Sequence, residues 1–322
     1  MGTLPMRKWL ILMGLAAVLA DCGPRAATPS APAERTFPSV EVPSMLGDRA
    51  EQLDYVLGHF WDRFTDTAQV YACDSTLVNG VRKEGVESQM GLYATLLDQA
   101  PVPDAVRSVS RFYDRLDAFE RKYPESNVFE ELVALTSRYL YDANSPVRNE
   151  EFYLPFVERL AASDLIDDGY RRGYAWDARK CGLNRLGTGA ADFSFTDTKG
   201  RIRTLYGIQA DYVLLIFANP GCNACQELTA AMQASPKISD LIASGRLKVV
   251  DVYIDQEVDD WKAHIADYPA DWVNGYDHNY SIRTDLIYNV RAIPSIYLLD
   301  ASKTVLMKDA PQDKVLGALA AL

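Results

Sequence analysis

The chain has 322 residues, with 33 Lys and Arg against 44 Asp and Glu, a formal net charge of −11, and 48% hydrophobic residues. That apolar content excludes an intrinsically disordered protein, because disordered chains lack the apolar surface that offsets the entropy of ordering. The acidic balance, with no extended Lys/Arg cluster after residue 40, argues against a nucleic-acid partner. A polytopic membrane protein is also excluded, since only one apolar run approaches spanning length.

Residues 1–22 have the pattern of a bacterial lipoprotein signal peptide. Two basic residues precede the apolar run Trp9–Leu19, which is typical of a secretory signal. The run ends in Leu-Ala-Asp-Cys, which resembles a lipobox with Cys22 as the lipidated residue, although Asp21 replaces the usual small residue. We expect Cys22 to carry a membrane-anchoring lipid. The alternative is an uncleaved anchor or an ordinary signal, and either one exports the chain into an oxidising compartment.

Residues 23–47 are rich in Pro, Ala, Ser and Thr without apolar periodicity, which predicts a flexible tether. From 48 to 186, apolar residues recur at helical spacing and predict an all-α domain. Expected helices include 105–119, 129–140, 150–162 and 165–179, and prolines between them end the helices by removing a backbone donor. Ser126 or Asn127 is expected to cap the helix over 129–140.

At residue 187 the periodicity changes, and residues 187–322 predict an α/β domain with a mixed central sheet. Residues 192–205 have the alternation and central turn of a β-hairpin. The apolar runs 212–218, 247–254 and 295–299 predict strands buried on both faces. Helices are expected over 222–232 and 258–267, and a final strand and helix over 304–307 and 313–322. Strands that alternate with helices are typical of this fold class.

Two cysteines lie where the first buried strand turns into its helix, in the segment Pro-Gly-Cys-Asn-Ala-Cys that ends at Cys225. Thiols three positions apart lie on one side of a helical turn and can approach bonding distance. Cys222 falls at the helix start, where free N–H groups and the helix dipole favour the thiolate. We therefore predict that Cys222 attacks a substrate disulfide and that Cys225 resolves the mixed disulfide.

Two other uses of the Cys-x-x-Cys motif are open. A zinc site would need two further ligands, and no second paired motif exists among Cys73, Cys181 and the three histidines. We therefore expect no metal, and no cofactor other than the redox-active disulfide Cys222–Cys225. A purely structural disulfide is the other alternative. Cys73 and Cys181 themselves are expected either to form a structural bridge or to remain free thiols.

From about Gly189 to the C-terminus the sequence resembles the TlpA/ResA-like branch of the thioredoxin superfamily. The resemblance rests on Ala-Asp-Phe at 191–193, on the apolar strand that leads into the dithiol, and on Ile293-Pro294-Ser295. It implies a cis Ile293–Pro294 bond that faces the dithiol and leaves the preceding backbone free to pair with a substrate chain. The helical half resembles, more weakly, an uncharacterised region that precedes such domains in bacterial envelope lipoproteins.

Three positions depart from the family pattern. Gly221 replaces the usual Trp before the first cysteine, which makes the rim of the substrate-binding site less bulky. Ile216 stands where thioredoxins carry a buried acid, and Leu228 stands where cytochrome-maturation members carry a glutamate. Asp255, at the end of the second buried strand, is a candidate for a nearby acid, with helix capping as its alternative role.

The resemblance implies an envelope-tethered thiol–disulfide oxidoreductase that acts on exported cysteine-containing proteins. Its other partners would be an unidentified upstream thiol reductant and the membrane, and its folded part would face the periplasm or the outside. A peroxiredoxin-like peroxidase is one alternative, but it would need Thr or Ser where Asn219 stands. A redox-silent lipoprotein that binds a ligand through its helical domain is the other.

Overall fold

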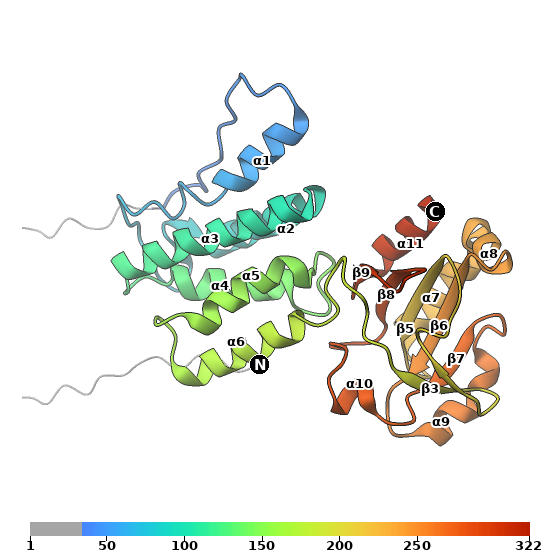
Figure 1. Cartoon of the computed structure of the whole chain (residues 1–322). Coiled ribbons are helices and arrows are strands. Elements are labelled where there is room, and N and C mark those ends of the chain that lie inside the picture. Colours follow the sequence, from blue (N-terminus) through green and yellow to red (C-terminus); the bar gives the residue numbers. More distant parts are fainter. Residues whose placement is uncertain (1–33) are drawn as a thin grey trace, which may run out of the picture. The chain divides into compact units, whose positions relative to one another are not determined.

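The computed structural model describes residues 34–322, which belong to one compact unit. The predicted signal peptide, Cys22 and the first part of the predicted tether lie outside the described residues. A helical part is followed by a part built on a mixed β-sheet (Figure 1), which confirms the predicted fold class. Among the described helices, none has both the length and the apolar character needed to cross a membrane.

The helical part surrounds an aromatic core. The ring of Trp61 stacks on that of Phe112 at 4.8 Å, and Phe112 stacks in turn on Phe156 at 5.5 Å. The apolar stripes of the sequence therefore bury against one another, as helical periodicity predicts. The helices are α1 (Arg49–His59), α2 (Lys83–Gln99), α3 (Val102–Lys122), α4 (Val128–Leu140), α5 (Glu150–Ala162) and α6 (Asp168–Cys181).

Two local features of the helical part differ from expectation. A short hairpin of β1 (Leu77–Val78) and β2 (Val81–Arg82) precedes α2, and its turn uses positive φ angles at Asn79 and Gly80. Asn127 occupies the N-cap position of α4 but forms no side-chain capping hydrogen bond. Its amide instead donates to the carbonyl oxygens of Asp74 and Leu77.

Residues 34–47, which the sequence assigns to the flexible tether, instead lie against the helical part. Phe37 stacks on Phe64 at 5.1 Å and contacts the ring of Trp61 edge-on. The guanidinium of Arg35 donates to the carbonyl oxygen of Asn79 and lies 3.7 Å from the centroid of the Tyr71 ring. An aromatic side chain and a stacked cation thus help to dock a segment whose overall composition is that of a linker.

Seven strands form the mixed sheet, in the order β4-β3-β7-β6-β5-β8-β9. The central strand β5 (Tyr212–Phe217) pairs in parallel with β6 (Leu247–Tyr253) and antiparallel with β8 (Ser295–Asp300). The outer strands are β3 (Ser194–Asp197), β4 (Ile202–Thr204), β7 (Val273–Tyr276) and β9 (Val305–Lys308).

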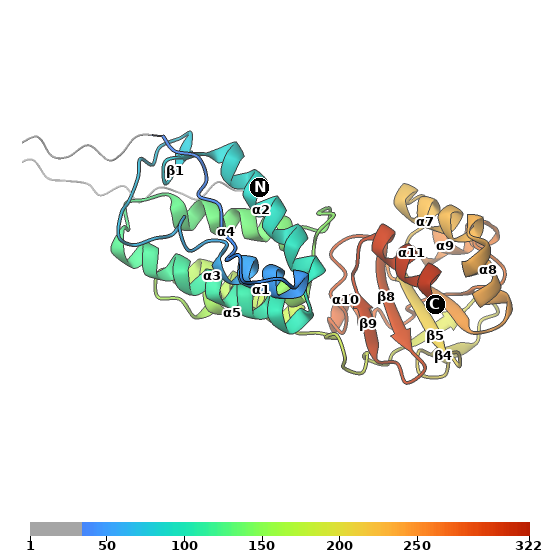
Figure 2. The ribbon, with the colours of Figure 1, turned by 90° about the horizontal axis from the view of Figure 1, so that it is seen from above.

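Both faces of the sheet are covered. Successive side chains of a strand point to opposite faces, so the residues of β5 divide between two clusters. Leu214 and Ile216 of β5 pack in one cluster with α7 (Asn223–Ala234), α8 (Pro236–Ala243) and α11 (Gln312–Ala321), helices that Figure 2 shows together. The alternate β5 residues pack in a second cluster with Tyr288 and with Ile282 of α10 (Ser281–Thr284). A further helix, α9 (Val258–Ala263), is followed by a 3₁₀ turn over Ile265–Asp267.

Strand β7 is not among the strands expected from the sequence, and it contains an Asn274-Gly275 pair of the kind common in turns. The glycine is required there for packing: a Cβ on Gly275 would lie 2.6 Å from the ring of Phe195 and 2.7 Å from the carbonyl oxygen of Thr196. The close approach of β3 excludes a side chain at that position.

Candidate active site

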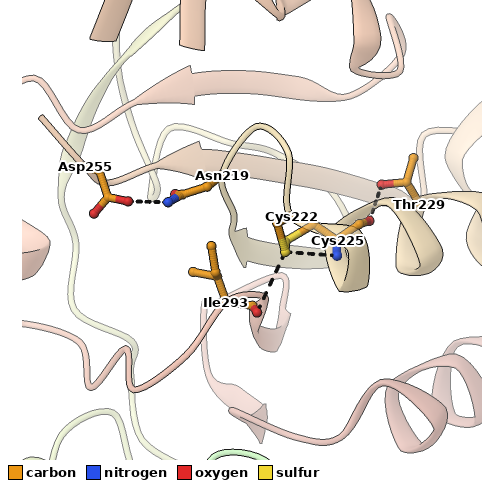
Figure 3. The surroundings of a disulfide bond; sticks show 6 residues. All are labelled: Asn219, Cys222, Cys225, Thr229, Asp255 and Ile293. Carbon is orange, nitrogen blue, oxygen red and sulfur yellow. Dashed lines mark hydrogen bonds between the residues drawn. A yellow bond between two sulfur atoms is a disulfide. The ribbon is translucent and has the colours of Figure 1, made fainter. Parts of the chain in front are cut away.

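The dithiol lies at the end of the central strand, on the first turn of α7. Gly221 has a φ of 74°, a left-handed conformation that glycine adopts without a Cβ penalty, and it turns the chain into the helix. Cys222 is the N-cap of α7, and it forms a disulfide with Cys225 across a Cα–Cα distance of 5.3 Å (Figure 3). The structure therefore joins the two cysteines that the sequence selects.

The two sulfur atoms occupy different environments. Gly221 is exposed and Cys222 is half-buried, whereas Cys225 is 9% exposed. The backbone N–H of Cys225 donates to Sγ of Cys222 at 3.2 Å. That N–H is one of the helix-terminal donors without an intrahelical partner, so it is positioned to stabilise a thiolate on Cys222 once the disulfide is reduced.

The Ile293–Pro294 bond is cis, and the carbonyl oxygen of Ile293 lies toward the dithiol. Sγ of Cys222 lies 3.8 Å from the carbonyl oxygen of Ile293, as Figure 3 shows. Strand β8 begins at Ser295, which pairs with Phe217, the last residue of β5. The cis-proline segment and the dithiol segment therefore meet the sheet at the same end of these two strands. The segment before Pro294 thus lies directly beside the sulfur that is closer to solvent.

An acid that the sequence analysis missed lines a pocket beside the dithiol. Asp251 is 4% exposed, in the middle of β6, and the β5–β6 register pairs it with Ile216. Its Oδ1 has no hydrogen-bond partner among the described residues, and burial raises its pKa to about 7. A lone carboxylate inside the apolar run 249–254 was the signal in the sequence that could have identified it.

Asp251 and Cys225 line the same pocket, which has a volume of about 320 Å³. Polar side chains on its other walls include Gln226, Thr229 and Tyr268. The hydroxyl of Tyr268 is buried and without a hydrogen-bond partner in the described part of the chain, and burial raises its pKa. A roomy pocket with several unpaired polar atoms is suited to hold water between the carboxyl group and the resolving sulfur.

Asp255, the acid that the sequence proposed, has a different environment. Its carboxylate pairs with Arg283 at 2.6 Å and accepts a hydrogen bond from the side-chain amide of Asn219 (Figure 3). It does not cap α9 either, since Glu257 is the N-cap residue of that helix. Asp255 instead ties the segment before the dithiol to the end of β6.

The remaining described cysteines are free thiols, so the disulfide alternative for Cys73 and Cys181 is not formed. Cys181 is fully buried at the end of α6, and burial raises the pKa of its thiol. Cys73 is half-buried and accepts a hydrogen bond from the backbone N–H of Asn79. Across residues 34–322, no group of three or more His, Cys, Asp or Glu side chains is arranged to hold a metal ion.

The chain is similar to known proteins in both of its parts. A family model described as a domain of unknown function, DUF5106, matches residues 21–174. The crystal structure of a thioredoxin-like protein from Bacteroides caccae is 33% identical, with a TM-score of 0.78, and the match covers 89% of this chain and 99% of that chain. A search of curated proteins found no match.

Two shorter solved structures match the C-terminal part. The C-terminal domain of an uncharacterised Bacteroides fragilis protein is 47% identical over 42% of this chain and 98% of its own, with a TM-score of 0.41. A domain of a possible thiol-disulfide isomerase from Cytophaga hutchinsonii is 26% identical over 44% of this chain and 94% of its own, with a TM-score of 0.37. The likeness to the Bacteroides caccae protein decides the family, and residues 21–174 add only a match to the DUF5106 model: this chain belongs to the thioredoxin-like proteins.

Proposed function

We propose that the protein is a thiol–disulfide oxidoreductase that reduces or isomerises disulfides of exported proteins through Cys222 and Cys225. The observation that carries this proposal is the placement of Cys222. It is the N-cap of α7, it is bonded to Cys225, and it lies 3.8 Å from the carbonyl of Ile293 in the cis-proline segment. Helix-terminal donors favour a thiolate there, and a thiolate is the attacking species in disulfide exchange.

The reaction begins from the reduced dithiol. The Cys222 thiolate attacks one sulfur of the substrate disulfide, a new S–S bond joins enzyme and substrate, and the other substrate sulfur leaves as a thiolate. The thiol of Cys225 then loses its proton and attacks Sγ of Cys222. The enzyme disulfide forms, and the second substrate sulfur leaves. The substrate has gained two electrons from the enzyme, and an upstream dithiol then reduces the enzyme disulfide with two electrons of its own and becomes a disulfide itself.

Asp251 is the group we assign to the proton of Cys225. Both side chains line one pocket, and a pKa of about 7 leaves a carboxyl group divided between its two protonation states at neutral pH. An acid with that pKa can accept a proton from the thiol and return it to solvent at little cost. Without such a group, the buried thiol of Cys225 would have to ionise next to apolar side chains.

The segment before Pro294 is where we expect the substrate chain to bind. An extended substrate pairs by main-chain hydrogen bonds with exposed backbone, and side-chain pockets then add selectivity. Gly221 on the opposite rim has no side chain, and a Cβ there would meet no atom within 4 Å. The rim is therefore open enough for a folded protein with a partly exposed disulfide.

Export and lipid attachment at Cys22 are part of the same proposal. They are supported by the lipobox-like ending of the N-terminal apolar run. A tethered enzyme of this class would meet exported cysteine-containing proteins and draw electrons from a thiol reductant in the same compartment.

Insulin reduction by dithiothreitol tests the proposal. Wild type should accelerate it, Cys222→Ser should abolish the acceleration, and Cys225→Ser should accumulate a mixed disulfide that a thiol releases. Wild type that leaves the insulin rate unchanged would contradict the proposal and favour a redox-silent binding protein. Peroxide consumption that depends on Cys222 would favour the peroxidase.

A further inference from the structure

Five charged side chains form a buried cluster that joins the helical part to the cis-proline segment. We call it the Glu150 cluster, and it consists of Glu150, Arg148, Arg291, Lys308 and Asp309. Their side chains are 1%, 13%, 9%, 2% and 4% exposed, respectively. Charged residues are almost never buried to this degree unless they are paired.

Glu150 is the first residue of α5, and its carboxylate makes three contacts with the thioredoxin-like part. Oε1 lies 3.1 Å from Nε of Arg291, and Oε2 lies 2.8 Å from Nζ of Lys308. Both are ion pairs by distance, without the alignment of a hydrogen bond. The side-chain amide of Asn289 donates to Oε1. Two of the three partners therefore lie on the segment that leads into Ile293.

Arg291 is held from a second direction. Its Nη2 donates to Oδ2 of Asp309 at 2.6 Å, and its Cζ lies 4.5 Å from the ring centroid of Tyr141. The other carboxylate oxygen of Asp309 accepts a hydrogen bond from the hydroxyl of Ser295 at 2.8 Å. Arg291 and Ser295 flank the Ile293–Pro294 bond, so the cluster fixes the cis-proline segment at both ends.

We propose that Glu150 is a positioning residue for the active site, and that it acts through Arg291 and Asn289 on the segment beside Cys222. The helical domain would then take part in substrate binding without touching the substrate. This inference rests on the proposed function, because it assigns a role in that reaction.

Charge balance gives the physical reason. With Glu150 ionised, two carboxylates face three cations in the cluster. Without that charge, Asp309 alone faces Arg148, Arg291 and Lys308, which repel one another in a medium that screens them poorly. Arg291 is the cation two residues from Ile293, so its movement toward water shifts the substrate-binding backbone.

The neighbouring residue provides a matched control. Glu151 lies on the same helical turn and its side chain is 4% exposed. It pairs with Arg185 at 2.7 Å and accepts from the backbone N–H of Leu186 at 3.0 Å, both of which precede the hairpin of β3 and β4. Glu151→Gln therefore removes the same buried charge without breaking a contact to the cis-proline segment.

The test uses the full chain and two substrates: a peptide that contains a disulfide, and a small aromatic disulfide that reports only on Cys222. Glu150→Gln should raise KM for the peptide about fivefold, with kcat and the small-disulfide rate within about twofold of wild type, an effect typical of indirect coupling. Glu151→Gln should leave KM unchanged. Hydrogen exchange of the amides between Arg291 and Ile296 should accelerate in Glu150→Gln and not in Glu151→Gln.

If Glu150→Gln does not fold, Arg291→Gln tests the same link from the other side and should reproduce the KM effect. If both fold, the double variant should be no worse than Arg291→Gln alone, because the two act as one unit. A peptide KM equal to that of wild type, or the same change in Glu151→Gln, overturns the inference while the proposed function stands. Wild type without any disulfide reduction overturns both.

Discussion

Asp251 on β6 is the register partner of Ile216 on β5, so a carboxyl group occupies the level of the sheet at which the neighbouring strand leads to the dithiol. Val249, two positions earlier, packs in the cluster that contains Cys225 and Leu228. Residues two apart on a strand share a face, so Asp251 points to the α7 side of the sheet. The adjacent strand therefore supplies the carboxyl group that we propose as the proton acceptor of this site.

We expect Asp251→Asn to slow the resolving step about 100-fold at neutral pH, since general base assistance contributes roughly that much. The attack of Cys222 on a small disulfide should change little. Rapid-quench measurement of the mixed disulfide separates the two steps. Asp267→Asn is the control, because Asp267 is an exposed acid on the wall of the same pocket. A resolving rate that is unchanged in Asp251→Asn would remove Asp251 from the mechanism.

The same carboxyl group predicts a pH dependence of stability. Burial raises its pKa from 3.8 to about 7, so between those values the folded state holds a proton that the unfolded chain has lost. The free energy of unfolding should therefore fall as pH rises through this window, by at most about 1.4 kcal/mol per pH unit from this group. It should level off above the folded pKa.

Urea denaturation of wild type and Asp251→Asn at several pH values measures this contribution. The variant should gain stability relative to wild type as pH rises from about 4 to about 7, because Asn does not titrate. Groups common to both proteins cancel in the difference. A difference that stays constant with pH would show that the carboxyl group is not held protonated by burial.

Gly221→Ala should destabilise the turn before the dithiol. The glycine has a φ of 74°, and an L-residue in that conformation costs about 1–2 kcal/mol. No atom lies within 4 Å of the added methyl group, so backbone strain is the only expected effect. Gly317→Ala, inside α11 and equally free of contacts, should instead stabilise the chain by about 0.5–1 kcal/mol. Thermal unfolding of the two variants should show shifts of opposite sign.

Phe37→Ala should release the segment 34–47 from the helical part. The side chain stacks on Phe64 and contacts Trp61, so its loss should cost about 2 kcal/mol, less than for a fully buried ring. Limited proteolysis should then cut this segment faster than in wild type. Val42→Ala is the control, since Val42 is 39% exposed. Equal cleavage rates in wild type and Phe37→Ala would indicate that the docking contributes nothing in solution.

The sequence alone determined the features that depend on neighbours along the chain. A buried strand, a glycine turn and a helix place Cys222 at the helix N-terminus and Cys225 one turn deeper, because helical geometry sets that spacing. The helical stripes were also predictable, since an apolar residue every three or four positions requires one buried face. Strand β7 was not, because its Asn274-Gly275 pair is explained only by the close approach of β3.

Only the tertiary structure decided which distant residues meet at the site. The register of β5 and β6 pairs Asp251 with Ile216, and Asp251 then lines the same pocket as Cys225. No local sequence pattern determines that register to the residue. Glu150 meets Asn289 across a separation of 139 residues, and each has the sequence context of an ordinary polar residue. Burial determines the electrostatic behaviour of the carboxyl groups of Asp251 and Glu150, and burial depends on how the rest of the chain packs around them.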